Sequence, residues 1–218
     1  MCRVLDQWTL GQKIVRRQIE LGIGSILPAF QGNVPKELAS LFPAANISKE
    51  LPGESSSRAV GWLDGLDPLF ARISDMVLLE LISDFGRTGF YEADGFFDHS
   101  AAPWLDHVHA GIHSRANRST TTLSRVAGSS RAGAVYASMQ RADASAVWVY
   151  QGWPWKGLSK SLEGKNFMQG FTSAVPFGSL VILDLEAESE EVWRASESFY
   201  GATFIECAMD DFVRILYS

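Results

Sequence analysis

Short apolar segments alternate with segments of helical periodicity along this chain, and the alternation restricts the folds it can adopt. Residues 10–21 and 69–85 carry apolar side chains at helical spacing, and Asp67-Pro68 is a typical helix start. Gly22 is a plausible stop for the first of these helices. The apolar segments have the length of strands and comprise residues 23–30, 90–94, 146–150, 180–185 and 202–207. Strands that alternate with helices form a parallel sheet through right-handed crossovers.

Polar side chains follow the predicted strands, as in a (β/α)8 barrel, where sites lie at the carboxyl ends of the strands. They are Gln31 and Asn33, Asp94 and Asp98, Gln151 and Trp153, and residues 184–188. A doubly wound fold would need a glycine-rich phosphate loop after its first strand, and the sequence has none there. We therefore predict an α/β fold, a partial (β/α)8 TIM barrel with about five parallel strands and intervening helices.

The segment from His113 to Gly133 is rich in Ser, Thr, Arg and Gly. Such composition is typical of loops, so we predict a mobile insert over residues 113–133. Residues 134–142 are predicted to be helical.

Composition and charge exclude several classes of partner. The 218 residues are 46% hydrophobic and 20% charged, which is typical of a globular chain. The net charge of −6 is spread over interleaved acids and bases, and without a basic patch we expect no nucleic-acid partner. No segment has the length and apolarity of a membrane span, and we detect no signal peptide. Two sequons, at Asn46 and Asn117, would be used only on the secretory route.

Neither the cysteines nor the histidines of this sequence predict a metal site. Cys2 and Cys207 lie at opposite ends of the chain and provide neither a disulfide framework nor metal-ligand spacing. His107, His109 and His113 could be drawn as a zinc site, but no cysteine or well-spaced acid completes it. We favour an exposed histidine-rich loop and predict no metal and no cofactor.

Five motifs occur in a fixed order over residues 5–207 and together resemble the α-N-acetylglucosaminidases, glycoside hydrolase family 89. They are residues 27–35 (LPAFQGNVP), residues 67–70 (DPLF), residues 91–96 (YEADGF), residues 146–153 (AVWVYQGW) and residues 175–188, which contain VP and LDLEAE. The resemblance implies that residues 1–218 are an incomplete (β/α)8 catalytic domain. It also implies hydrolysis of terminal N-acetyl-α-glucosamine, as found in heparan sulfate, with retention of configuration, and a lysosomal, vacuolar or secreted location.

The resemblance assigns the acid/base through the family pattern D-x-F-N-E, which runs here from Asp94 to Asp98. Phe97 stands where the family has Asn, and Asp98 stands where it has Glu. Asp98 is the candidate acid/base, although its carboxyl is one methylene shorter. The alternative is that Asp98 is a solvated loop acid.

The remaining site residues are expected to contact the carbohydrate. Trp153 is positioned by the resemblance to stack on a sugar ring, with a core or rim aromatic as the alternative. Gln151 and Asn33 are expected either to hydrogen-bond a sugar hydroxyl or to serve as local polar caps. Asp94 is expected to support the site through hydrogen bonds. Phe97 is also expected to be one of the substrate-binding residues.

The nucleophile is expected in a later segment. The family stretch W-C-x-x-H-N-F-G-G begins here at Glu206-Cys207 and then departs, with Asp210-Asp211 in place of His-Asn. Two hypotheses remain open. The first is a glycosidase of the α-N-acetylglucosaminidase type. The alternative is a truncated non-catalytic fragment or pseudoenzyme with at most weak sugar binding, and the sequence does not decide whether this chain is an enzyme or in which oligomeric state it exists.

Overall fold

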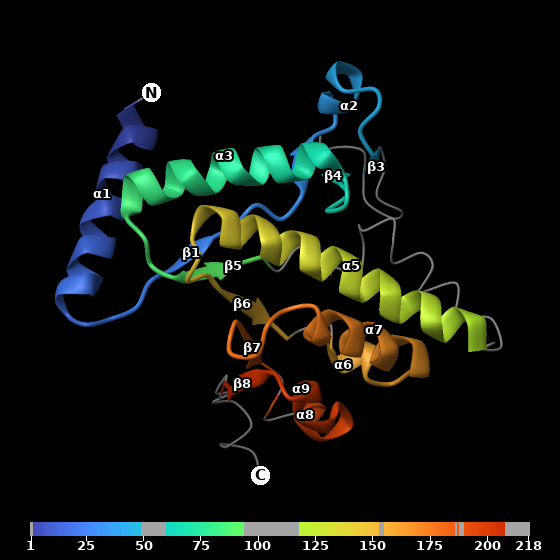
Figure 1. The fold of residues 1–218 in the computed structure, drawn as a ribbon. Coiled ribbons are helices and arrows are strands. Elements are labelled where there is room, and N and C mark those ends of the chain that lie inside the picture. The colour runs from blue at the N-terminus through green and yellow to red at the C-terminus, as the bar shows by residue number, and fades with distance from the viewer. Residues whose placement is uncertain are drawn as a thin grey trace, which may run out of the picture. The chain divides into compact units, whose positions relative to one another are not determined.

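The computed structural model describes residues 2–48, 60–93, 118–152, 155–185, 187 and 190–207. Its five-stranded sheet has the order β1-β5-β6-β7-β8 (Figure 1), with these strands at Ile26–Pro28, Phe90–Glu92, Val147–Gln151, Leu180–Asp184 and Thr203–Glu206. The pairings of β1 with β5, β5 with β6 and β7 with β8 are parallel. The predicted α/β fold with a parallel sheet is confirmed.

The chain divides into two compact units by the density of its internal contacts. The first unit comprises Met1–Phe96 and Ala134–Val149, and the second comprises Phe97–Gly133 and Tyr150–Ser218. The units are described separately below. The prediction that residues 1–218 form one incomplete catalytic domain stays a prediction.

Local sequence signals predict the start of one helix of the first unit and the end of another. Helix α3 (Pro68–Phe85) follows Asp67, whose side chain accepts a hydrogen bond from the Leu69 amide. Helix α1 (Cys2–Glu20) ends in a Schellman motif, because the Ile23 amide donates to the Gln18 carbonyl and Gly22 has φ +72°. The end at Gly22 is confirmed, whereas the helix begins earlier than the predicted Leu10.

Three helices of the first unit are connected by side-chain hydrogen bonds. Trp8 on α1 donates its indole N–H to the Asp84 carboxylate on α3 at 2.8 Å. The hydroxyl of Ser74 on α3 donates to the hydroxyl of Ser138 on α5 at 2.9 Å, and both serines are buried. An ion pair between Asp75 and Arg141 joins the same two helices at the surface. These contacts fix α3 against the C-terminal part of α5 (Figure 1).

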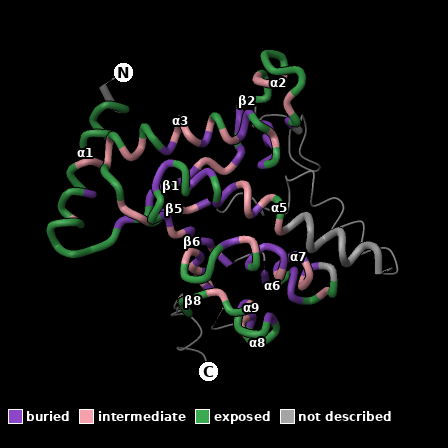
Figure 2. Tube along the Cα trace, in the orientation of Figure 1, coloured by how far each residue is buried: buried purple, intermediate pink, exposed green. Residues whose placement is uncertain are grey.

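Helix α5 extends from Arg118 to Ala142. The prediction of a loop over residues 113–133 is therefore wrong for residues 118–133, and residues 113–117 lie outside the described part. Serine, threonine and glycine each cost a helix less than about 1 kcal/mol, and no proline interrupts this stretch. Burial near its C-terminal end (Figure 2) outweighs these costs. There Val135 and Met139 are almost fully buried.

A small antiparallel sheet, which sequence reasoning missed, has the order β2-β4-β3. Its strands are Asn33–Pro35, Val60–Leu63 and Ile47–Ser48, and helix α2 (Leu38–Leu41) lies between β2 and β3 in the chain. These strands have only two to four residues. Such short segments are too brief for periodicity to reveal them.

An aromatic core holds the second unit together. Its helices are α6 (Trp155–Leu158), α7 (Leu162–Ser173), α8 (Val192–Ala195) and α9 (Glu197–Tyr200). The Trp155 ring lies 5.1 Å from the ring of Phe199 and 5.9 Å from those of Tyr150 and Phe171. Each of these four side chains is at most 1% exposed, which typically stabilises a fold by about 2–3 kcal/mol per side chain.

Helix α9 is a left-handed turn. Its four residues, Glu197 to Tyr200, all have φ between +51° and +58°. For residues other than glycine this conformation costs roughly 1–2 kcal/mol each. The buried Phe199 ring, 5.0 Å from that of Phe204, helps to hold the turn in place.

Candidate functional site

In the second unit, three strand ends are joined by backbone hydrogen bonds. The Gly152 amide, just after β6, donates to the Leu183 carbonyl at 2.8 Å, and the Cys207 amide, just after β8, donates to the Asp184 carbonyl at 3.0 Å. Gln151, the last residue of β6, is half-buried at this edge. The carboxyl edge of the parallel sheet therefore brings Gln151 and Asp184 into the region where (β/α) barrels build their sites.

Gly152 has a steric reason to be glycine. A Cβ at this position would lie 2.8 Å from the Leu183 carbonyl oxygen, closer than real Cβ contacts. The absence of a side chain lets the backbone turn against β7 directly after Gln151. The glycine of the Gln151-Gly152 motif is thus required by the close approach of two backbones.

Cys207 is poorly suited to act as a nucleophile. Burial, followed by the negative charge of Asp184, raises the pKa of the Cys207 thiol above its usual value. The reactive form of cysteine is the thiolate, and both effects disfavour it. The resemblance of Cys207 to a family position therefore does not give it a chemical role in this arrangement.

In the first unit, β1 and β5 end side by side. Pro28 pairs with Glu92, and the Ala29 amide, just past β1, donates to the Glu92 carbonyl at 2.7 Å. The chain continues through a tight segment in which Gly32 has φ +106° and accepts a hydrogen bond from the Leu63 amide. Asn33 follows as an exposed residue of β2, opposite Trp62.

The structure thus describes two of the predicted site residues. Gln151 lies at the carboxyl end of β6 as expected, and Asn33 lies in the antiparallel sheet, one residue past the tight Gly32 segment. Their sugar-binding roles stay predictions. The other four predicted site residues, Asp94, Phe97, Asp98 and Trp153, lie outside the described residues.

The predicted histidine-rich loop, with His107, His109 and His113, also lies outside the described residues. Within the described ranges, no group of three or more His, Cys, Asp or Glu side chains is placed to hold a metal ion. Across the same ranges, no helix is both long enough and apolar enough to span a bilayer.

A shallow cavity between α1 and α3 has a volume of about 360 Å³. It is lined by Gln12, Arg16, Ile19, Glu20 and Asp84–Gly86. Its α3 side lies at the helix end that leads into β5, and therefore near the amino end of that strand. Sites of (β/α) barrels lie at the opposite end of the strands, so the location of this cavity does not favour it as the active site.

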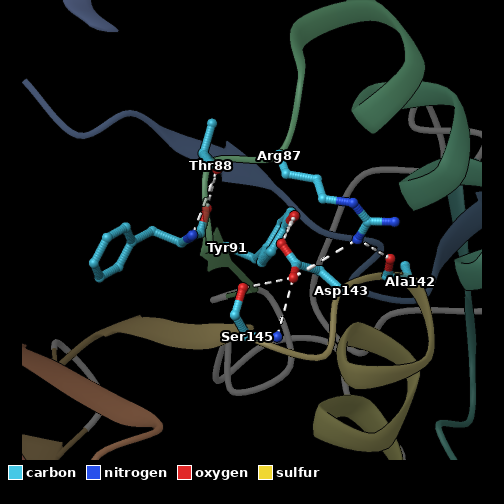
Figure 3. A network of polar contacts seen from close by, with 7 residues as sticks. Arg87, Thr88, Tyr91, Ala142, Asp143 and Ser145 are labelled. Carbon is cyan, nitrogen blue, oxygen red and sulfur yellow. Dashed lines mark hydrogen bonds and ion pairs between the residues drawn. The ribbon is translucent and has the colours of Figure 1, made fainter.

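A buried polar network, which sequence reasoning missed, joins the amino ends of β5 and β6 (Figure 3). The Tyr91 hydroxyl donates to the Asp143 carboxylate at 2.8 Å, and the Ser145 hydroxyl and amide donate to it at 2.7 and 3.0 Å. Arg87 lies 3.7 Å from the same carboxylate and donates to the Ala142 carbonyl at 2.6 Å. This end of a (β/α) barrel is the stabilising end, so we assign the network to structure.

The network changes the pKa values of its two acidic groups in opposite directions. For Asp143, burial opposes ionisation, but hydrogen bonds from Ser145 and Tyr91 and the charge of Arg87 prevail and lower its pKa below 3.8. For Tyr91, burial and the neighbouring Asp143 raise the pKa well above 10.0. Asp143 is therefore charged and Tyr91 neutral throughout the neutral range.

Known proteins with similar sequences and folds support one family. Residues 3–215 match the α-N-acetylglucosaminidase (NAGLU) TIM-barrel domain. The human α-N-acetylglucosaminidase is 30% identical over 211 residues, which are 95% of this chain and 26% of the human protein. This chain therefore spans about a quarter of the length of that relative.

Two solved structures have a similar fold. A family 89 glycoside hydrolase from Clostridium perfringens, in complex with 2-acetamido-1,2-dideoxynojirmycin, has a TM-score of 0.64 at 20% identity, covering 87% of this chain and 19% of the bacterial one. The Clostridium perfringens protein in complex with its substrate GlcNAc-α-1,4-galactose has a TM-score of 0.59 at 19% identity, covering 83% and 18%. With the sequence match over nearly the whole chain, this chain belongs to the α-N-acetylglucosaminidase TIM-barrel family, glycoside hydrolase family 89.

Proposed function

We propose that the protein containing this chain removes terminal N-acetyl-α-glucosamine residues from glycans such as heparan sulfate, with retention of configuration. The observation that carries the proposal is the family match over residues 3–215. The parallel sheet supports it, because Gln151 lies at the carboxyl end of β6, where sites of this fold are built. By family resemblance we also propose a lysosomal, vacuolar or secreted location.

Retaining hydrolysis requires two carboxyl groups roughly 5 Å apart, one as acid/base and one as nucleophile. Asp98 is our candidate for the acid/base. By the family pattern, we expect the nucleophile at a position C-terminal to these five motifs. Trp153 is proposed to stack on the sugar ring, and Gln151 and Asn33 to hydrogen-bond its hydroxyls. Asp94 and Phe97 complete the proposed contact set.

Release of N-acetylglucosamine from an aryl α-glycoside by the intact gene product tests this proposal. Asp98→Asn should lower kcat by at least about 100-fold with a smaller effect on KM, because acid/base catalysis contributes roughly 100- to 10,000-fold. Glu80→Gln, an exposed position on α3, is the matched control and should retain full activity. Unchanged turnover in Asp98→Asn would exclude Asp98 as the acid/base.

A non-catalytic sugar-binding protein is the second candidate. It is favoured by the sequence Phe97-Asp98, which replaces the Asn-Glu pair expected at the acid/base. This candidate predicts that the intact gene product binds an N-acetyl-α-glucosaminide without releasing the sugar. Turnover of the aryl glycoside would rule it out.

A further inference from the structure

The register of the first unit sorts its strand residues onto two faces of the sheet. Residues paired across parallel strands point to the same face, and successive residues point to opposite faces. One face carries Leu27, Tyr91 and Trp148, which are 5%, 0% and 0% exposed. The other carries two rows of side chains, one made of Ile26, Phe90 and Val147 and the next of Pro28, Glu92 and Val149.

The polar network identifies the face that is covered by helices. Tyr91 reaches Asp143, the residue directly after α5, so the Tyr91 face lies on the side of this helix. Helices cover the outside of a (β/α) barrel, and the opposite face forms its interior. The rows that contain Phe90 and Glu92 therefore face the interior. In agreement with this, Ile26 and Phe90 remain 47% and 39% exposed in this part of the barrel.

Glu92 is the single charged residue of these two interior rows. Its row is the one closer to the carboxyl ends of the strands, because Glu92 is the last residue of β5. Its side chain is half-buried, and its main chain is held by the Ala29 amide at 2.7 Å. A carboxylate at this point of a (β/α) barrel lies where substrates bind.

We propose that the Glu92 carboxylate accepts hydrogen bonds from hydroxyl groups of the bound sugar, a role that rests on the proposed carbohydrate function. Sugar hydroxyls are donors, and hydrogen bonds to a charged acceptor are roughly twice as strong as neutral ones. Its position is set by the strand rather than by a loop, because its register with Pro28 and Val149 fixes the direction of the side chain. Glu92 is thus a sugar-binding residue outside the family's acid/base pattern.

The test measures binding of N-acetylglucosamine, the released sugar that the enzyme cannot hydrolyse further, to the intact gene product by calorimetry, beside its release from an aryl α-glycoside. Glu92→Gln keeps the size of the side chain and removes its charge, and should weaken binding by about tenfold at an unchanged melting temperature. Glu92→Asp retains the charge and should recover part of the affinity. Glu80→Gln should bind as the wild type does.

The outcomes separate this inference from the proposed function. A wild type that binds N-acetylglucosamine while Glu92→Gln binds it equally well overturns the role of Glu92 and leaves the proposed function intact. A wild type that neither binds nor hydrolyses overturns both. In a third outcome, Glu92→Gln binds more weakly but also has a lowered melting temperature, and Glu92→Asp restores neither the binding nor the melting temperature. That result assigns Glu92 to folding and overturns the inference.

Discussion

The hydroxyl of Tyr91 and the carboxylate of Asp143 form a 2.8 Å hydrogen bond between residues that are 52 positions apart in the chain. Both side chains are at most 3% exposed. The bond ties strand β5 to the turn that leads into β6 (Figure 3). It therefore helps to hold β5 beside the start of β6, with which it pairs.

Removing the Tyr91 hydroxyl should destabilise the fold. We expect Tyr91→Phe to lower the free energy of unfolding by about 1–3 kcal/mol, since a buried charged acceptor loses one donor. Tyr136→Phe is a matched control, because the Tyr136 hydroxyl donates to the uncharged Ala146 carbonyl at 3.2 Å, and its loss should cost about 1 kcal/mol or less. Urea denaturation followed by circular dichroism measures both. Equal losses of unfolding free energy in Tyr91→Phe and Tyr136→Phe would show that the charge of the acceptor makes no added contribution.

The same pair predicts how stability depends on pH. The pKa of Asp143 is lowered on folding, so its contribution is present above pH 3.8, its ordinary value, and is lost as the pH falls through the folded pKa. The pKa of Tyr91 is raised, so its contribution is complete below pH 10.0 and is lost as the pH rises beyond it. Melting temperatures measured across this range should show both losses. Asp143→Asn should reduce the acid loss, and Tyr91→Phe should reduce the alkaline one.

Gly152→Ala should be destabilising by about 1–3 kcal/mol, because its Cβ would meet the Leu183 carbonyl oxygen at 2.8 Å. The matched control is Gly133→Ala in α5, where the nearest atom to a new Cβ is 3.9 Å away on Ala174. That change should stabilise the helix by up to about 1 kcal/mol. Thermal denaturation measures the stability of the two variants. A melting temperature of Gly152→Ala equal to that of the wild type would contradict the close approach of the two backbones.

The left-handed turn of α9 predicts a stabilising change. Ser198 is exposed at φ +58°, where glycine has no steric penalty. Ser198→Gly should raise the free energy of unfolding by about 0.5–1 kcal/mol, whereas Ser198→Ala should not. A lower melting temperature for Ser198→Gly than for Ser198→Ala would show that this turn is not left-handed in solution.

Helix α1 is exposed over most of its length (Figure 2). Its exposed apolar side chains include Leu10 at 55% and Ile14 at 49%. An apolar surface of this kind promotes self-association. In the isolated 218-residue chain, we expect the double change Leu10→Gln and Ile14→Gln to lower the binding of a hydrophobic dye without loss of helix content. Val15→Gln on the same helix alters a side chain that is 9% exposed and should destabilise the fold instead. Unchanged dye binding in the double variant would show that the apolar surface that binds the dye lies outside Leu10 and Ile14.

Local signals in the sequence were sufficient for much of the fold. Asp67-Pro68 predicted the start of α3, because a capping carboxylate and a proline both favour the first turn of a helix. The strand at residues 180–185 was predicted from its apolar run and is found at Leu180–Asp184. The loop predicted for residues 113–133 was wrong over residues 118–133, because propensities of less than about 1 kcal/mol per residue do not outweigh tertiary packing.

The sequence predicted the family, while the roles of the candidate site residues stay predictions. The order of the motifs identified the family. Gln151 was expected just after a strand, because alternating β/α units put polar residues at strand ends, and it is the last residue of β6. Glu92 lies within a recognised motif but was not singled out, since a period of two assigns residues to alternate faces without saying which face is the interior.

By itself, the sequence determined the alternation of strands and helices, the C-terminal end of α1, the start of α3, and family membership. All of these depend on residues close together in the chain or on their order. Only the tertiary structure decided the register of β1, β5 and β6, the Tyr91–Asp143 hydrogen bond and the face on which Glu92 lies. The physical reason is that these features join residues far apart in sequence. Their free energy comes from burial and from hydrogen bonds that exist only once the strands have paired.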